Sequence, residues 1–372
     1  MAYHVRRGTL IDISGAMARG EGERMETLPA QSLGRETHRP RSRVAGYFTL
    51  VASVLVILAG CAGTQTPSAP SGLATRLSTA SAVVTPPFDP SVGAPLPNNR
   101  IVAAYGIVGG IEANGPASTL DMLDNFLPQL QDLGKQYAAL DPIHPVKLGI
   151  DLVVNVIQPC GAFPQYCASW ADDDTIKAYI DFSQKHDLYL FLDVQLGTEP
   201  VEHAVTQHLL PYLRTYPFVE LALDTEFHFP NTPDGYAQAA GYPCCLGWMG
   251  ADEVNWAIHE LAQIAVQQQL PRKVLIVHEW NSYVLHDKDK IKRDPGVSVV
   301  LQSDGFGGYD NKLGDYQIFV RQELLEYGGY KLFFPHCASP CSYDVDPNGA
   351  RRVQSPREVM SIFPQPLFIS YQ

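Results

Sequence analysis

Residues 218–226 read FVELALDTE, and this stretch decides the fold and points to the site. Successive residues of a strand face opposite sides. Leu221 and Leu223 therefore share an apolar face, whereas Asp224 and Glu226 share the other face. Because helices cover the apolar face of a parallel sheet, we expect the carboxyl groups to point into the interior of a closed sheet.

The chain around this stretch contains seven further apolar runs, each of strand length. They are 101–107, 146–154, 188–194, 274–279, 297–303, 330–335 and 366–371. Amphipathic segments separate them, such as 118–140, where Ser118 and Asp121 have capping-box spacing, and 251–269. Eight strand–helix units in residues 100–372 predict one α/β domain, a (β/α)8 TIM barrel.

The division into a polar and an apolar face recurs on other predicted strands. The residues expected to point inward are Asp151, Asn155, Asp193, Gln195, Gln302 and Asp304. Barrel enzymes place their chemistry at the carboxyl ends of the strands. By this rule one mouth of the barrel is lined by Glu226, His228, His278, Glu279, Trp280, Asp304 and His336.

The carboxyl groups at this mouth suggest acid–base chemistry. We expect Glu226 to be the proton donor, since burial among apolar and acidic neighbours raises a carboxyl pKa. Asp224 would orient Glu226, and Asp304 would be the second carboxylate. Two carboxyl groups facing each other across a cleft are the minimum requirement for glycoside hydrolysis.

Other residues at the mouth are expected to bind the substrate rather than react with it. They are Asp193, Gln195, His228, His278, Trp280 and His336, and Phe306 and Tyr309 are further candidates for stacking on sugar rings. No cofactor is expected. The predicted function is a glycoside hydrolase-like enzyme acting on a polysaccharide or a cell-envelope glycan.

Two alternatives stay open. The barrel could bind a saccharide without catalysis, with its carboxyl groups held in ion pairs; Lys331 is a candidate partner. It could also be a metal-dependent hydrolase using His228, His278, Asp304 and His336. The segment 344–349 begins like a calcium loop, but an Asx-type turn explains it more simply.

The sequence bears two resemblances to known groups of barrel proteins. The run Asp224-Thr225-Glu226 resembles the end of the chitinase-type barrel motif, in which the Glu is the acid and the Asp positions the substrate. Further acids of that motif are replaced here by Val219 and Ala222, so only these two roles are carried over. Residues 100–372 also resemble uncharacterised exported bacterial barrel lipoproteins, through ALDTEF (222–227), KVLIVHEW (273–280), DGFGG (304–308) and PLFISYQ (366–372). This second resemblance implies the architecture but no reaction.

The N-terminal part of the chain predicts export. Residues 44–60 are apolar and follow a basic run, which is typical of a signal peptide. They end at Cys61, whose context resembles a lipobox, so Cys61 would carry a lipid that anchors the protein outside the cytoplasm. A transmembrane anchor is the alternative. Residues 1–60 are thus a signal region, and the Pro-, Ser- and Thr-rich residues 61–99 a flexible tether.

The net charge of the chain indicates which classes of partner to exclude, and its cysteines indicate which disulfides to expect. Residues 1–60 hold eight basic and five acidic side chains, so the remainder carries 19 basic and 34 acidic ones, a net charge of −15. Such a surface repels nucleic acid. After export, Cys160–Cys167 and Cys337–Cys341 are expected to form disulfides, while Cys244 and Cys245 stay unassigned. A zinc site at His336, Cys337 and Cys341 is the alternative.

Overall fold

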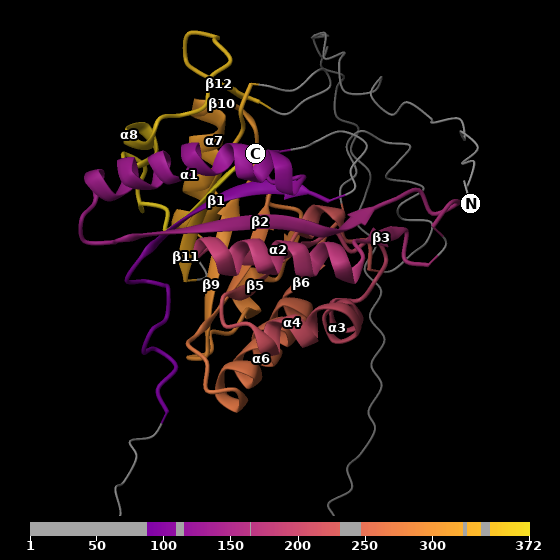
Figure 1. Ribbon diagram of the computed structural model, residues 1–372. Coiled ribbons are helices and arrows are strands. Elements are labelled where there is room, and N and C mark those ends of the chain that lie inside the picture. The colour runs from indigo at the N-terminus through magenta and orange to yellow at the C-terminus, as the bar shows by residue number, and fades with distance from the viewer. Residues whose placement is uncertain (1–87, 109–114, 164, 231–246, 323–325, 336–342) are drawn as a thin grey trace, which may run out of the picture. The chain divides into compact units, whose positions relative to one another are not determined.

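The central feature of the molecule is a closed barrel of parallel strands (Figure 1). The computed structural model describes residues 88–108, 115–163, 165–230, 247–322, 326–335 and 343–372. Eight strands form the barrel in the order β1 (Arg100–Ile107), β2 (Val146–Ile157), β4 (Tyr189–Val194), β5 (Val219–Leu223), β7 (Lys273–Glu279), β9 (Val297–Ser303), β11 (Tyr327–Leu332) and β13 (Phe368–Tyr371). Because β13 pairs with β1, the barrel closes, and the predicted (β/α)8 fold is confirmed.

Helices and short strands fill the connections between the barrel strands. The described helices are α1 (Leu120–Leu140), α2 (Asp173–His186), α3 (Val201–Ala204), α4 (Leu210–Thr215), α6 (Ala251–Gln267), α7 (Tyr309–Tyr316) and α8 (Pro356–Val359). The short strands are β3 (Ala168–Trp170), β6 (Met249–Gly250), β8 (Leu285–His286), β10 (Gly307–Gly308) and β12 (Asp344–Val345). Two π-helical segments cover Val205–Leu209 and Gln317–Gln322, and 3-10 turns cover Thr225–Phe227 and Lys288–Lys290.

Two hydrophobic clusters lie on the two faces of the barrel sheet. The larger one joins the outward residues of the strands, such as Leu221 and Leu223, to the surrounding helices. The smaller one fills the interior and includes Ile101, Phe191 and Ala222. The predicted alternation of inward and outward residues is therefore confirmed for the third barrel strand and, as far as Asp224, for the fourth.

The fourth barrel strand is shorter than predicted. β5 ends at Leu223, and Thr225–Phe227 form a 3-10 turn, whereas the sequence predicts a strand through Glu226. The side-chain alternation consequently stops after Asp224. The turn is held by Thr225, whose hydroxyl donates a hydrogen bond of 2.7 Å to the carbonyl of His278.

Polar side chains cap the N-termini of three of the described helices, α1, α2 and α8, and Ser355 caps α8 in a capping box with Glu358. The predicted cap at Ser118 is wrong, since Thr119 caps α1 by accepting a hydrogen bond from the Met122 N–H. Ser118 instead accepts one from the Ile107 N–H and so fastens the β1–α1 connection. Asp172 caps α2 by accepting a hydrogen bond from the Thr175 N–H.

One strand–helix unit departs from the predicted regular pattern. Between β7 and β9 the described chain forms β8 and a single 3-10 turn in place of an α-helix. Helix α6 compensates, because its residues Leu261 and Ala262 pack in the same cluster as Val297 and Val299 of β9. The closest approach is at Gly296, where an added Cβ would lie 3.0 Å from the Cα of Ala262.

The segment before β1 is part of the folded domain rather than of the tether. Leu96 is fully buried and belongs to the interior cluster of the barrel, and the Pro90 carbonyl accepts a hydrogen bond from the Arg272 N–H. The predicted boundary at Asn99 is therefore too late.

Cys61 and the signal region lie outside the described residues. Within the described ranges, none of the helices combines the length and the apolar character that crossing a bilayer requires.

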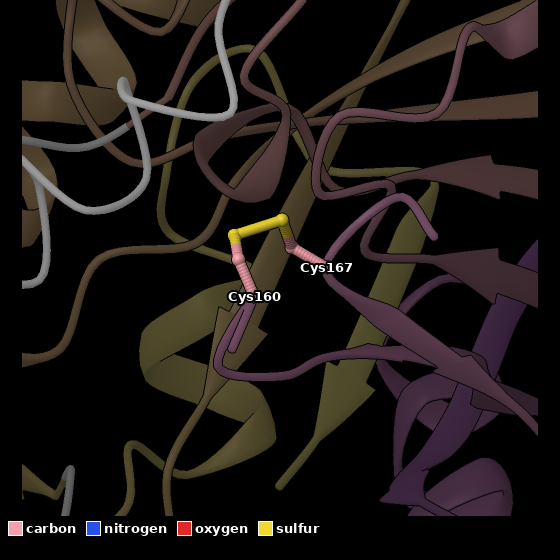
Figure 2. Close-up of a disulfide and its surroundings, with 2 residues drawn as sticks. All are labelled: Cys160 and Cys167. Carbon is pink, nitrogen blue, oxygen red and sulfur yellow. A yellow bond between two sulfur atoms is a disulfide. The ribbon is translucent and has the colours of Figure 1, made fainter. Parts of the chain in front are cut away.

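One disulfide is present among the described residues. Cys160 and Cys167 are bonded after the end of β2, with a Cα–Cα distance of 4.3 Å (Figure 2), as predicted. The other predicted pair, Cys337–Cys341, and the residues Cys244 and Cys245 lie outside the described residues, as does the alternative zinc site with His336.

Candidate active site in the barrel

Five carboxyl groups gather at the carboxyl ends of the barrel strands, above the interior cluster. They belong to Asp151 of β2, Asp193 of β4, Asp224 and Glu226 after β5, and Asp304 after β9. The first three and Asp304 are at most 5% exposed. Glu226 is partly exposed, but its Oε2 atom is buried. The charges of Asp304 and Asp224 both raise the pKa of Glu226. This effect is consistent with the sequence prediction that the three carboxyl groups lie together.

Two bases share this interior with the carboxyl groups. Lys331 Nζ lies 3.2 Å from Asp304 Oδ2, and His278 Nδ1 lies 2.9 Å from the same oxygen. On its other side, His278 Nε2 lies 3.5 Å from Asp193 Oδ2. Lys331 also lies over the ring of Tyr105, 3.7 Å from its centroid. These contacts fix Asp304 in an ionised state between two cations.

The remaining carboxyl groups are poorly paired. Among the described residues, several buried atoms have no hydrogen-bond partner: both oxygens of Asp151 and of Asp193, Asp224 Oδ1, Glu226 Oε2 and His278 Nε2. Buried polar atoms in native proteins are nearly always satisfied by protein, water or ligand. The oxygens of Asp151, Asp224 and Glu226 in this set are therefore available to bind water or a ligand in the barrel interior.

Burial and mutual repulsion make several of these groups unusually weak acids. Burial, and then the charges of Asp304 and Asp224, raise the pKa of Glu226 well above its ordinary value. Burial and Asp193 raise the pKa of Asp224 to about 7. Burial, with a further contribution from Asp151, raises the pKa of Asp193 to about 6. Near neutral pH the cluster thus holds protons that an ordinary carboxyl group would have lost.

The pKa values of His278, Lys331 and Asp304 shift in the direction that favours the charged form of each group. Burial alone would lower the pKa of His278, but Asp193, Asp304 and Asp151 raise it to about 10. Burial opposes the ionisation of Asp304, yet Lys331 and His278 together lower the pKa of this carboxyl group. The site therefore contains a permanently ionised carboxylate beside protonated ones, a division of roles typical of acid–base catalysis.

Aromatic side chains border the same strand ends. Trp280, directly after β7, stacks on Phe306 with ring centroids 6.2 Å apart and an interplanar angle of 14°. Phe306 is 43% exposed and also contacts Phe333 edge-on. Tyr309 does not take part, since its hydroxyl donates to the Arg352 carbonyl and its ring is buried. Trp280 and Phe306 thus form the exposed aromatic surface, and Tyr309 is a packing residue.

Three predicted mouth residues have their side chains engaged within the protein. His228 is fully buried and its Nε2 atom lies 2.9 Å from Glu253 of α6, so the strand pattern that placed it at the mouth is wrong. Glu279 pairs with Lys288. Gln195 donates to Asp224 Oδ2 at 3.2 Å and accepts from the Ile157 N–H, which makes it a positioning residue for Asp224. His336 lies outside the described residues.

A separate ion pair stabilises the opposite end of the barrel interior. Lys273 donates to the Val219 carbonyl at 2.7 Å, and its Nζ lies 4.0 Å from Glu220 Oε2. Glu220 also accepts from the Val274 N–H. Both side chains are buried and fully engaged, so this pair is structural, and the inward carboxylate at Glu220 has no role in the site.

Two features near the site are not among the residues predicted from the sequence: Tyr105 in the barrel interior, and the separate group Glu199, His203 and His208. Tyr105 could have been placed there by the alternation of β1, where Ile101 and Ala103 face the interior cluster. The group Glu199, His203 and His208 gave no signal, because its histidines are five residues apart in a helix.

The expected Asx turn at 344–349 is confirmed, since Asp346 accepts hydrogen bonds from the N–H groups of Asn348 and Ala350.

Some of these residues are also arranged as metal ligands. Asp151, Asp193 and His278 offer one ligand atom each within 4.8 Å of one another, and so do Asp224, His278 and Asp304. The second set is already occupied by the ion pair with Lys331. The first set contains the ion pair between His278 and Asp193, but neither oxygen of Asp151 has a hydrogen-bond partner among the described residues.

The fold by itself does not select among these chemistries, because this barrel supports many unrelated reactions. Comparison of the chain with protein-family models, curated proteins and solved structures finds no match. The chemistry of the site residues themselves is therefore what indicates the function.

Proposed function

We propose that the barrel is a glycoside hydrolase-like enzyme in which Glu226 is the general acid and Asp304 the ionised second carboxylate. The observation that carries this proposal is the contrast between the two groups. Glu226 keeps its proton through burial and through the charge of Asp304, and one of its oxygens has no partner among the described residues. Asp304 is held ionised by Lys331 and His278.

In this proposal Glu226 donates its proton to the glycosidic oxygen as the bond to the sugar breaks. Asp304 stabilises the positive charge that develops on the sugar ring, and Asp224 orients Glu226 and the substrate. Water then adds to the anomeric carbon and gives a proton to the ionised Glu226, which restores the acid. The partly exposed position of Glu226 leaves it accessible, while the surface of Trp280 and Phe306 suits the apolar face of a pyranose ring. The substrate class is a polysaccharide or a cell-envelope glycan.

The test is the release of reducing ends from a panel of cell-envelope and plant polysaccharides by the purified full chain. The Glu226→Gln variant should lose between about 100- and 10,000-fold in turnover, the usual contribution of a general acid. It should retain turnover on aryl glycosides whose leaving group needs no proton. Glu202→Gln, on the exposed first turn of α3, is the matched control. Equal turnover of the Glu226→Gln variant and the unmodified protein on the polysaccharide would exclude the mechanism.

A metal-dependent hydrolase is the second candidate, and one observation favours it. Both oxygens of Asp151 are buried without a partner among the described residues, and they face His278 and Asp193. A divalent cation would satisfy all three residues at once. Metal analysis of the purified protein separates the two candidates. One bound equivalent that is lost in Asp151→Asn, together with activity abolished by a chelator, would replace the acid–base proposal.

We also propose that the protein is exported and lipid-anchored through Cys61, with the barrel outside the cytoplasm. The support is the basic run followed by the apolar residues 44–60 and the small residues before Cys61. In a bacterial host, a Cys61→Ser variant should move from the detergent phase to the aqueous phase on detergent partitioning. If the variant stays in the detergent phase, residues 44–60 are a transmembrane anchor instead.

A further inference from the structure

A second polar cluster lies after β4, and it shares no residue with the carboxyl cluster of the barrel. It consists of Glu199, in the connection from β4 to α3, His203 of α3 and His208 of the following π-helical segment. His203 Nδ1 lies 2.7 Å from Glu199 Oε1, and His208 Nε2 lies 3.6 Å from the same oxygen. The three ligand atoms lie within 4.8 Å of one another.

The π-helical segment brings the two histidines together. In an α-helix, residues five positions apart are rotated by about 140° from each other, so His203 and His208 would point in different directions. Val205–Leu209 instead form hydrogen bonds of the i→i+5 type. The two imidazole rings consequently lie close together in an edge-on arrangement, with centroids 6.3 Å apart and an interplanar angle of 61°. Such insertions in helices are frequent at functional sites.

Trp170 contacts two of the three side chains and leaves their ligand atoms directed toward the third. Trp170 donates a hydrogen bond of 3.0 Å to Glu199 Oε2, so Oε1 is turned toward the histidines. The Trp170 ring also stacks on His208, 4.1 Å between centroids, and fixes its plane. This is the pattern by which outer residues orient the ligands of a metal.

Geometry and accessibility fit a small cation. Tetrahedral zinc with bonds of about 2.0–2.1 Å separates its ligand atoms by roughly 3.3 Å, and the two separations from Glu199 Oε1 lie on either side of this value. Glu199 is fully buried, whereas the side chains of His203 and His208 are each 37% exposed. A cation can therefore reach the ligands from solvent and be held by a buried negative charge.

We propose that Glu199, His203 and His208 form a binding site for a borderline divalent transition metal such as Zn²⁺. Two imidazoles and one carboxylate leave the fourth tetrahedral position to water, as in zinc sites that keep an open coordination position. The site lies close to the barrel mouth, since Asn155 at the end of β2 also approaches Glu199 Oε2, at 3.4 Å.

The first experiment measures Zn²⁺ binding to the metal-stripped full chain in competition with a chromophoric chelator. The double variant His203→Ala/His208→Ala should lose one equivalent of bound zinc, and Trp170→Phe should weaken that equivalent by about 10-fold. His144→Ala is the matched control, because His144 likewise pairs with a carboxylate, Asp141, at 2.6 Å but belongs to none of the ligand groups found in the described chain. An unchanged number of equivalents in the double variant would overturn the proposal.

A second experiment uses the unmodified protein and so does not depend on the variants folding. Diethyl pyrocarbonate modifies accessible imidazoles, and mass spectrometry identifies the modified residues. Zn²⁺ should protect His203 and His208 from modification but leave His144, whose side chain is 32% exposed, as reactive as before. Equal modification of His203 and His208 with and without Zn²⁺ would contradict the site. Because neither experiment measures turnover, the outcome is independent of the glycosidase proposal.

Discussion

Lys331 is the residue on which the charge balance of the barrel interior depends. Its ammonium group lies 3.2 Å from Asp304 and over the ring of Tyr105, and it is 4% exposed. Without it, His278 alone would face the carboxyl cluster. Burial raises the pKa of Asp193 and of Asp224, and the neighbouring carboxylates raise both further, so the loss of Lys331 would remove a charge that opposes these effects.

Replacing Lys331 with Met should destabilise the fold by about 3–5 kcal/mol, since one partner of a buried ion pair is left behind. Urea unfolding followed by circular dichroism measures this loss. The double variant Lys331→Met/Asp304→Asn should recover part of it, because the orphaned charge is then removed as well. A loss below about 1 kcal/mol in the single variant would mean that the pair is not a stabilising element.

Asp224 makes the stability of the protein depend on pH in a defined direction. The pKa of Asp224 is about 7 in the folded chain and about 4 in an unfolded one. Between these values the folded state binds the extra proton, so the contribution of Asp224 to stability falls as the pH rises from about 4 to about 7. Below about pH 4 both states are protonated and this cost is absent.

The Asp224→Asn variant should therefore be more stable than the unmodified protein at about pH 7.5, by roughly 1–3 kcal/mol, and the difference should shrink to below about 1 kcal/mol at about pH 4.5. The amide oxygen can still accept the hydrogen bond from Gln195. Denaturant unfolding at the two pH values checks the prediction. A difference that is constant with pH, or larger at the lower pH, would show that Asp224 ionises normally in the folded chain.

At the scale of single elements, the N-terminus of α2 allows the effect of a capping hydrogen bond to be measured separately from the effect of the helix dipole. Asp172 accepts a hydrogen bond of 2.8 Å from the Thr175 N–H, whereas Asp173 and Asp174 lie in the first turn. Asp172→Ala should cost about 1 kcal/mol. Asp174→Ala should lower the free energy of unfolding by only a few tenths of a kcal/mol, because it removes just a favourable interaction with the helix dipole. Thermal unfolding of the two variants side by side is the measurement, and equal losses would contradict the assignment of Asp172 as the cap.

The end of β5 shows where the two-residue periodicity of the sequence no longer predicts the structure. Residues 218–223 follow the two-residue alternation of a strand, but Asp224 leaves the extended conformation and a 3-10 turn follows. The turn is fixed by the bond from Thr225 to the His278 carbonyl, which lies on a different strand. His228 therefore turns toward Glu253 of α6, a contact that no local pattern predicts.

At the scale of the whole molecule, the segment before β1 closes one end of the barrel. Leu96 is fully buried in the interior cluster with Ile101 and Phe368. Leu96→Ala should destabilise the protein by about 2–5 kcal/mol, as expected for a cavity in a packed core. Val92→Ala, at an earlier position that is 71% exposed, is the control and should change stability by less than about 0.5 kcal/mol. A small effect of Leu96→Ala would mean that this segment belongs to the tether after all.

The sequence by itself determined the architecture and most of the inward-facing residues. Alternating strand and helix patterns are local, and the two-residue period of a strand assigns each side chain to a face without reference to the rest of the chain. Asp151, Asp193, Asp224 and Asp304 were placed in the interior on this basis, and the structure places them there.

Only the tertiary structure decided which of these groups are paired and which are not. Asp304 meets His278 and Lys331 because closure of the barrel brings β7, β9 and β11 side by side, and these partners are 26 and 27 residues away in the chain. The approach of His208 to Glu199 and His203 likewise depends on the π-helical segment Val205–Leu209. Contacts across strands and helix irregularities depend on the packing of the entire barrel, so a local pattern in the sequence does not contain them.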